Sequence, residues 1–288
     1  MKRNQTSTTA EGIALMRMIE SAKPEDERVV YDPYAQVFVN PFLKVLAKIF
    51  SSPAAMERRG KGVVGFLAAR ERHIDEFTRQ CLDEGIRQVV ILGAGYDSRA
   101  LRIPGMQQAR VFEVDLPATQ AVKQQKLEKH LGQLPAHVTY VPVDFNTQSL
   151  GKQLGAAGYD QHQQTLFIWQ GVVYYITQQA VDATLKFIAT RSAPGSALIF
   201  DYASPSYLKD TQHGEIKRMK AMQKMTGESL STGIPHEQIE PYLRERGFTD
   251  IHNATADDFK RLYFHGKNAG RAITPGYAIV TARVARRE

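Results

Sequence analysis

The chain has 288 residues, of which 43% are hydrophobic, so it can bury a sizeable core as one large α/β domain or as two domains. No apolar stretch is long enough to span a bilayer, and the opening MKRNQTSTTAEG lacks the apolar core of a secretory signal, which predicts a cytoplasmic protein with no membrane partner. The net charge of +7 is spread over several short basic runs, which favours solvated surfaces over a nucleic-acid partner.

The first predicted region is a helical cap over residues 1–60. Residues 8–50 show helical periodicity that breaks at PEDE, and Asp32-Pro33 in VYDPYAQVF marks a turn between two helical pieces. A long helix is then expected from Gly62 to Gly85, where the final glycine suits a C-terminal cap. This helix contains the single cysteine, Cys81, which has no histidine close in sequence and is predicted to be a buried, inert thiol.

Short apolar runs then alternate with helical segments, which predicts buried parallel strands joined by crossover helices. The runs are VVIL, VFEVD, VTYVPVD, TLFIW and SALIFDY. After Tyr202 the alternation stops, and residues 203–235 are interpreted as a helical lid insertion. Two further strands are expected in FTDIHNAT and GYAIVTARV. Residues 1–288 are therefore predicted to form a single α/β domain with a doubly wound, mostly parallel, seven-stranded Rossmann-like sheet.

A glycine turn follows the first strand in VVILGAGYDSRALR, residues 89–102. A strand, a tight turn and the start of a helix offer backbone N–H groups and a positive dipole end to a ligand. A dinucleotide site needs G-x-G-x-x-G, but after Gly93 and Gly95 the third position is Ser98. This departure disfavours an NAD(P)-dependent oxidoreductase, which stays an alternative, and suits a ligand without pyrophosphate, such as S-adenosylmethionine.

Acidic residues end the next two predicted strands. Asp115 stands 22 positions after Gly93, where a carboxylate accepts ribose hydroxyls, although it could instead cap the helix that begins near Pro117. Asp144 could accept from an adenine amino group while Phe145 covers the ring, or it could be a surface-turn acid. The carboxyl ends of parallel strands share one edge of a sheet, so the turn and both acids together predict an adenosine site.

Seven segments, in chain order, resemble the class I S-adenosylmethionine (SAM)-dependent methyltransferases of the leucine carboxyl methyltransferase type, including bacterial enzymes that methylate polyketide acids. They are YDPYAQVF, FLAARERHIDEF, VVILGAGYDSRALR, FEVDLPATQAVKQQKL, VPVDF, FIWQGVVYYIT and ALIFDY. The similarity runs from about residue 8 to residue 202 and becomes loose beyond the predicted lid. It implies a SAM cofactor and a methyl-transfer reaction to oxygen, with a small-molecule acceptor.

The resemblance also implies roles for individual residues. Arg70 corresponds to the arginine that binds the methionine carboxylate, and an arginine fork suits a carboxylate, although Arg70 could also be an exposed helix residue beside Arg72. Asp97 either accepts from the cofactor ammonium or suits a helix dipole. The implied cofactor-binding set is Arg70, Gly93, Gly95, Asp97, Asp115, Asp144, Phe145 and Gln170.

Gln170 is a departure from part of the family. Members that methylate a protein phosphatase have a glutamate at this position, in the segment that reads FIWQGVVYY here. A neutral amide does not offset a positive amino group as a carboxylate does, but its oxygen still accepts a hydrogen bond. The departure favours the bacterial small-molecule branch.

The methyl group of SAM is already activated, so the protein mainly holds the acceptor in line and excludes water. A carboxylate acceptor is ionised at neutral pH and needs no general base, whereas a phenol acceptor would use one of Tyr174, Tyr175, Tyr202 or His213. Core packing is the favoured role of Tyr174 and Tyr175, but Tyr175 and Tyr202 are also candidate substrate-binding residues. Met219, Met222 and Met225 are candidate pocket residues in the lid, and the scattered histidines predict no metal site.

Overall fold

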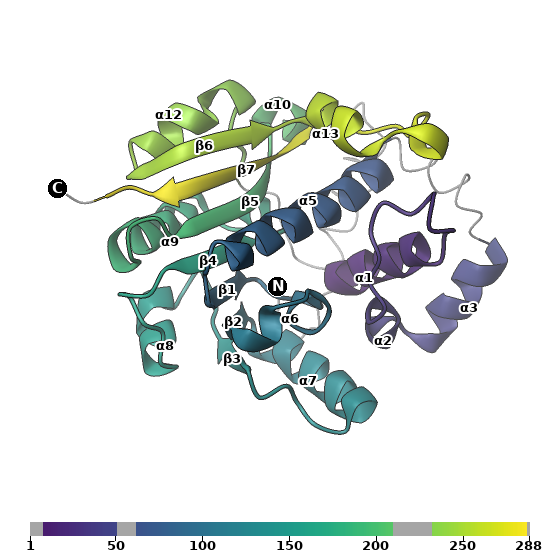
Figure 1. Cartoon of the computed structure of the whole chain (residues 1–288), viewed down its shortest axis with the longest axis horizontal. Coiled ribbons are helices and arrows are strands. Elements are labelled where there is room, and N and C mark those ends of the chain that lie inside the picture. Colours follow the sequence, from purple (N-terminus) through teal and green to yellow (C-terminus); the bar gives the residue numbers. More distant parts are fainter. Residues whose placement is uncertain (1–7, 51–61, 210–231, 287–288) are drawn as a thin grey trace.

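One seven-stranded sheet organises this computed structural model, which describes residues 8–50, 62–209 and 232–286 (Figure 1). The strands are β1 (Gln88–Leu92), β2 (Arg110–Asp115), β3 (Val138–Pro142), β4 (Thr165–Trp169), β5 (Ala197–Ala203), β6 (Phe248–Ala254) and β7 (Tyr277–Val284). Their order is β3-β2-β1-β4-β5-β7-β6. β1 to β5 are parallel, and β7 lies antiparallel between β5 and β6. The predicted α/β class and mostly parallel sheet are confirmed.

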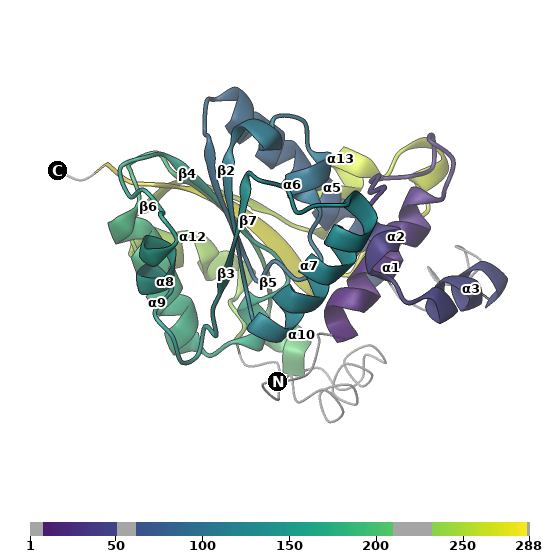
Figure 2. The ribbon, with the colours of Figure 1, turned by 90° about the horizontal axis from the view of Figure 1, so that it is seen from below.

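Helices cover both faces of the sheet (Figure 2). One face carries α5 (Val63–Asp83), α6 (Arg99–Arg102), α7 (Pro117–Leu131) and α13 (Ala256–Tyr263). The other carries α8 (Leu150–Ala156), α9 (Gln178–Arg191) and α12 (Ile239–Arg244). Successive strand side chains alternate between the faces, so Val89 and Ile91 belong to one buried core while Val90 and Leu92 belong to the other. This two-sided burial explains why the central strands are continuous apolar runs.

α5 ends at the glycine cap that the sequence predicts. Gly85 has φ 95°, which is the left-handed region that glycine adopts without steric cost. Its N–H donates to the Leu82 carbonyl and the Ile86 N–H donates to the Cys81 carbonyl, each at 3.0 Å. This pair of bonds is a Schellman motif, and it turns the chain directly into β1.

The N-terminal helices pack outside α5 and α7. They are α1 (Thr8–Ser21), α2 (Ala35–Phe38) and α3 (Pro41–Phe50), and α3 projects from the body of the molecule (Figure 2). Ala14, Phe38, Tyr96 and Leu127 form a third apolar core that joins α1 and α2 to the glycine turn and α7. The helical-cap prediction is therefore met over residues 8–50, while residues 1–7 and 51–60 lie outside the described part.

The predicted lid is described only at its two ends. α10 (Pro205–Lys209) begins it, and residues 232–235 lead into η3 (His236–Gln238). His213, Met219, Met222 and Met225 lie outside the described residues. Short 3-10 helices complete the described chain: η1 (Met106–Gln108), η2 (Val173–Tyr175) and η4 (Gly266–Asn268). In the ranges that are described, none of the helices has both the length and the apolarity to cross a membrane.

Candidate cofactor site

The glycine turn at the end of β1 has the geometry that its sequence predicts. Gly93 and Gly95 have φ values of 68° and 45°, which favour glycine. A Cβ on Gly93 would lie 2.2 Å from Cγ2 of Val172, so the turn and the loop after β4 touch directly. Ser98, at the position of the missing third glycine, uses its hydroxyl to donate to Asp32 Oδ2 at 2.7 Å. The departure from the dinucleotide pattern therefore serves an internal contact.

The start of a helix that is predicted after the turn is present but short, and a role for its dipole in ligand binding stays a prediction. α6 spans only Arg99–Arg102, four residues, so few peptide dipoles align there. The Arg99 N–H donates to Asp97 Oδ1 at 2.7 Å. The contribution of this dipole is therefore small, and the side chains and the backbone of the turn are the main candidate contacts for a ligand.

The two predicted adenosine acids lie at neighbouring strand ends. β2 and β3 are in register with Asp115 beside Pro142, and the Val143 N–H donates to the Asp115 carbonyl at 2.8 Å. The Asp115 carboxylate accepts from the N–H groups of Gly95 and Leu116, so it contacts the glycine turn. The strand ends thus bring the turn and Asp115 together.

Asp144 and Phe145 continue from β3 at the same edge. Both side chains are half-buried, and Phe145 packs against the core on the α8 and α9 side. Asp144 Oδ1 accepts from the Asn146 N–H at 3.0 Å, which is also how a turn acid behaves. A ligand role for Asp144 and Phe145 therefore stays a prediction.

Arg70 is a buried residue, so the alternative of an exposed helix arginine is wrong. Its guanidinium is 2% exposed and donates to Asp201 Oδ2 at 2.7 Å. The other carboxylate oxygen of Asp201 accepts from the Gly171 N–H at 2.5 Å. Arg72, by comparison, is 48% exposed and pairs with Glu76 one turn along α5. Asp201 therefore holds Arg70 against the loop that follows β4.

Tyr174 completes this group. Its hydroxyl lies 3.3 Å from Asp201 Oδ2 and 3.4 Å from Arg70 Nη1. Burial raises the pKa of Tyr174 well above its usual value, and the Asp201 carboxylate raises it further. The phenol stays protonated at neutral pH, which agrees with the packing role that the sequence favours for this residue.

Gln170 and Asp97 are joined by a buried charged chain. Gln170 Nε2 donates to Glu71 Oε1 at 2.6 Å, and Glu71 Oε2 accepts from Arg99 Nη2 at 2.6 Å. Arg99 also pairs with Asp97 and, at 2.7 Å, with Asp75. Burial would raise the pKa of Asp97, but the nearby cations, Arg99 first among them, together hold that pKa well below the usual range. Asp97 is thus an ionised partner of Arg99. That it also accepts a hydrogen bond from the ammonium group of the cofactor stays a prediction.

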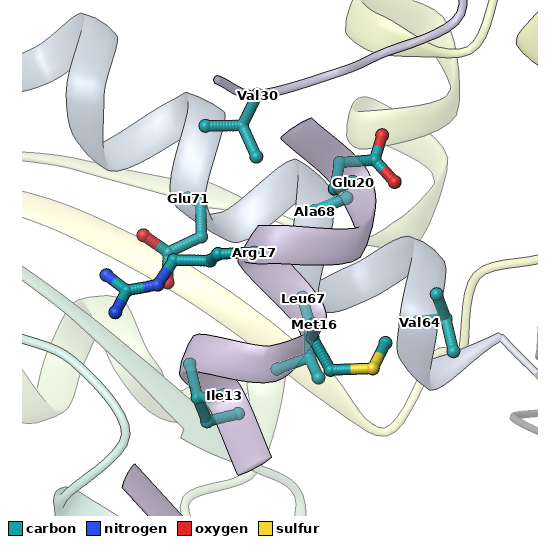
Figure 3. Close-up of a pocket in the computed structure, with 9 residues that line it drawn as sticks. All are labelled: Ile13, Met16, Arg17, Glu20, Val30, Val64, Leu67, Ala68 and Glu71. Carbon is teal, nitrogen blue, oxygen red and sulfur yellow. The ribbon is translucent and has the colours of Figure 1, made fainter. Parts of the chain in front are cut away.

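A small cavity lies between α1 and α5 beside this chain of contacts. Figure 3 shows Arg17 of α1 and Glu71 of α5 close together at one end, with apolar side chains such as Ile13 and Met16 along α1. Its volume is ≈ 10 Å³, which is room for about one water. The cavity is therefore too small to hold a methyl acceptor.

The two predicted substrate-binding tyrosines have different surroundings. The ring of Tyr175 is half-buried, 4.8 Å from that of Tyr174, beside the loop after β4. Tyr202 is fully buried in the core on the α8, α9 and α12 side, and its hydroxyl donates to Asn253 Oδ1 at 3.0 Å. Because its polar atom is already bonded and its ring lies in a core, the structure favours a packing role for Tyr202 over substrate binding.

Several buried charged residues of the site were not predicted from the sequence. They are Arg17, Asp32, Glu71, Asp75, Arg99, Arg102 and Asp201. A signal was present, since Glu71 and Asp75 are spaced i, i+4 among apolar residues of α5, and Arg99 and Arg102 are spaced i, i+3. Only the fold shows that these two pairs face each other. No group of three or more His, Cys, Asp or Glu side chains suited to a metal occurs in the described ranges.

Comparisons with known proteins agree with this geometry. The family model of leucine carboxyl methyltransferases matches residues 10–189. A putative SAM-dependent methyltransferase of Mycolicibacterium paratuberculosis is 31% identical, covering 93% of this chain and 89% of the relative. YktD of Bacillus subtilis, also a putative SAM-dependent methyltransferase, is 30% identical over 84% of this chain and 74% of its own length. A DUF574-family protein from Streptomyces avermitilis shares the fold, with TM-score 0.58 at 13% identity, covering 97% of this chain and 98% of that one.

The protein is therefore a class I methyltransferase, and the cofactor is SAM rather than NAD(P). More specifically, the chain belongs to the leucine carboxyl methyltransferase family.

The described residues fit this cofactor. Oε1 of Gln170 is a buried acceptor with no hydrogen-bond partner within the described residues, as a site for an amino group requires. Gly93 and Gly95 keep the turn free of side chains next to Asp115. Arg70 supplies a buried guanidinium, the group that suits a carboxylate, next to the loop after β4.

Proposed function

We propose that this enzyme transfers the methyl group of SAM to a carboxylate oxygen of a small, polyketide-like acid. SAM supplies an activated methyl group on a sulfonium. The protein has to hold the acceptor oxygen in line with that methyl and keep water out. That the enzyme acts in the cytoplasm, without a nucleic-acid or membrane partner, stays a prediction.

In this proposal the cofactor lies along the carboxyl edge of the parallel strands. Arg70 binds the methionine carboxylate, while Gln170 and Asp97 face the amino group. The backbone at Gly93 and Gly95 borders the sugar, and Asp115 accepts from the ribose hydroxyls. Asp144 and Phe145 bind the adenine. The contact of Asp115 with Gly95 and that of Gly93 with Val172 support this arrangement, because they hold three strand ends together.

The observation that favours a carboxylate acceptor is that two of the tyrosines considered as bases are hydrogen-bonded and protonated. The Tyr174 hydroxyl is held by Asp201 and Arg70, and the Tyr202 hydroxyl donates to Asn253. Burial raises the pKa of both tyrosines, so neither can readily take a proton from an acceptor. A carboxylate is ionised at neutral pH and needs no base. Gln170, in place of the glutamate of phosphatase-methylating members, supports a small-molecule acid.

Isotope-labelled SAM tests the proposal against a panel of small acids and matched phenols. A methyl ester releases labelled methanol in alkali, whereas an aryl methyl ether keeps its label. We expect label transfer to acids, with the product labile to alkali. Transfer to phenols alone, with an alkali-stable product, would instead support the hydroxyl-methylating alternative. In that case Tyr175 and His213 would be the next residues to test as bases.

A further inference from the structure

We propose that Glu71 is a positioning residue that sets the orientation of the Gln170 amide, so that the Gln170 carbonyl oxygen faces the amino group of the bound cofactor. This inference rests on the proposed placement of Gln170 beside that amino group. It adds a residue that touches no part of the cofactor but determines which polar atom the cofactor meets.

The hydrogen bond between the two residues fixes the direction of the amide. An ionised carboxylate only accepts hydrogen bonds, whereas an amide has one end that donates and one that accepts. Glu71 Oε1 lies 2.6 Å from Gln170 Nε2, so the amide nitrogen must face α5. The carbonyl oxygen then points away from Glu71, and it has no hydrogen-bond partner within the described residues.

Glu71 is itself held rigidly and in its charged form. It is 1% exposed, and its second oxygen pairs with Arg99 at 2.6 Å and with Arg102 at 3.7 Å. Burial would raise the pKa of Glu71, but the guanidinium groups of Arg99 and Arg17 hold it below the usual value. A carboxylate that stays ionised cannot donate to the amide oxygen, so the opposite amide orientation would lose this hydrogen bond.

The charges around Glu71 also favour a cation at this place. The buried ion-pair cluster has four arginines and five acids: Arg17, Arg70, Arg99 and Arg102, with Asp32, Glu71, Asp75, Asp97 and Asp201. It thus has one acid in excess. An ammonium group next to Gln170 would balance that excess, and replacing Glu71 by a neutral residue would remove it.

The test compares two ligands that differ in the amino-acid part. S-adenosylhomocysteine contains the amino group and the carboxylate, whereas 5′-methylthioadenosine keeps the adenosine and sulfur but lacks both. Calorimetric titration of each is done with the wild type, Glu71→Gln, Gln170→Glu and the double variant. Glu76→Gln, at an acid of α5 that is 41% exposed, is the matched control.

We expect Glu71→Gln to weaken the binding of S-adenosylhomocysteine by about 10- to 100-fold, the range for a lost hydrogen bond to a charged group. The affinity for 5′-methylthioadenosine should stay unchanged. The double variant should recover affinity for S-adenosylhomocysteine, because a carboxylate at position 170 then faces the ammonium directly. The double variant does not restore the carboxylate that Arg99 loses. Recovered affinity would therefore show that the group facing the ammonium matters, and not the Glu71 to Arg99 pair as a structural element.

Equal losses for both ligands in Glu71→Gln, or no recovery in the double variant, would overturn the proposal. If Glu71→Gln fails to fold, Gln170→Leu tests the premise that the Gln170 amide meets the amino group, since it removes the amide and keeps the Glu71 to Arg99 pair. Unchanged S-adenosylhomocysteine affinity in Gln170→Leu would also overturn it. Failure of the wild type to bind either ligand would point instead to an error in the proposed cofactor site.

Discussion

The Asp32 carboxylate accepts a hydrogen bond of 2.7 Å from the Ser98 hydroxyl across 66 positions of sequence. The other oxygen of Asp32 accepts from the N–H groups of Tyr34 and Ala35 and so begins α2. Arg17 of α1 pairs with Asp32 and donates to the Tyr96 carbonyl in the glycine turn. The N-terminal helices are therefore attached to the turn through Asp32, which gives the YDPYA segment a role beyond its predicted turn.

Asp32→Asn should destabilise the protein more than the loss of one hydrogen bond would. The amide can still begin α2, but it leaves Arg17 without its carboxylate partner, and removing one member of a buried pair costs about 3–5 kcal/mol. Ser98→Ala, the control, removes a neutral donor and should cost about 1 kcal/mol. Urea unfolding measures both. Equal effects of the two substitutions would show that the charge of Asp32 is not needed.

Arg70→Ala should lower stability as well as cofactor affinity. From sequence alone one expects loss of cofactor binding with the fold intact, but that expectation must be revised, because the substitution leaves buried Asp201 without its cation at a cost of about 3–5 kcal/mol. Arg70→Lys is the sharper variant. It keeps a cation near Asp201 and loses the fork that suits a carboxylate.

For Arg70→Lys we expect S-adenosylhomocysteine affinity to fall about tenfold or more, in line with the loss of a charge-assisted bond. The affinity for 5′-methylthioadenosine and the thermal midpoint should stay near those of the wild type. Wild-type affinity for S-adenosylhomocysteine in this variant would remove Arg70 from the cofactor site.

The pH dependence of stability should include a contribution from His73. Burial lowers its pKa from 6.5 in the folded protein, against the opposing effect of Glu76 and Asp258. The unfolded chain therefore binds the proton more readily, so this contribution is complete above about pH 6.5 and is lost as the pH falls towards the folded value. His73→Asn should show a smaller decline in unfolding free energy from pH 7 to pH 5. A decline as steep as that of the wild type would exclude His73 as a source.

Cys81 should be chemically silent in the folded protein. Its side chain is fully buried, and burial raises the pKa of the thiol to about 12, so almost no thiolate forms at pH 8. Labelling by iodoacetamide is expected to occur only in guanidinium chloride. Rapid labelling of the folded protein would contradict the packing of α5 against the sheet.

Sequence reasoning reached the strands, the glycine turn and the strand-end acids because each is a local pattern. β1 and β4 are almost entirely apolar, β2 combines apolar residues with Glu113 and Asp115, and Gly93 and Gly95 follow β1. Sequence reasoning could not predict the long-range contacts that fix the charge and orientation of the site residues. Arg70 is a helix arginine in sequence, and only the placement of β5 gives it Asp201 as a partner. The end of α6 at Arg102 does have a local signal, because Pro104 and Gly105 follow Ile103 and disfavour a longer helix.

The most direct test of the cofactor site is a crystal structure of the enzyme with S-adenosylhomocysteine. We predict the ligand along the carboxyl edge of β1 to β4, with its ribose at Asp115, its adenine at Asp144 and Phe145, and its carboxylate at Arg70. The amino group should lie at the Gln170 carbonyl oxygen. Density for the ligand at any other place, or a carboxylate that does not approach Arg70, would contradict the account.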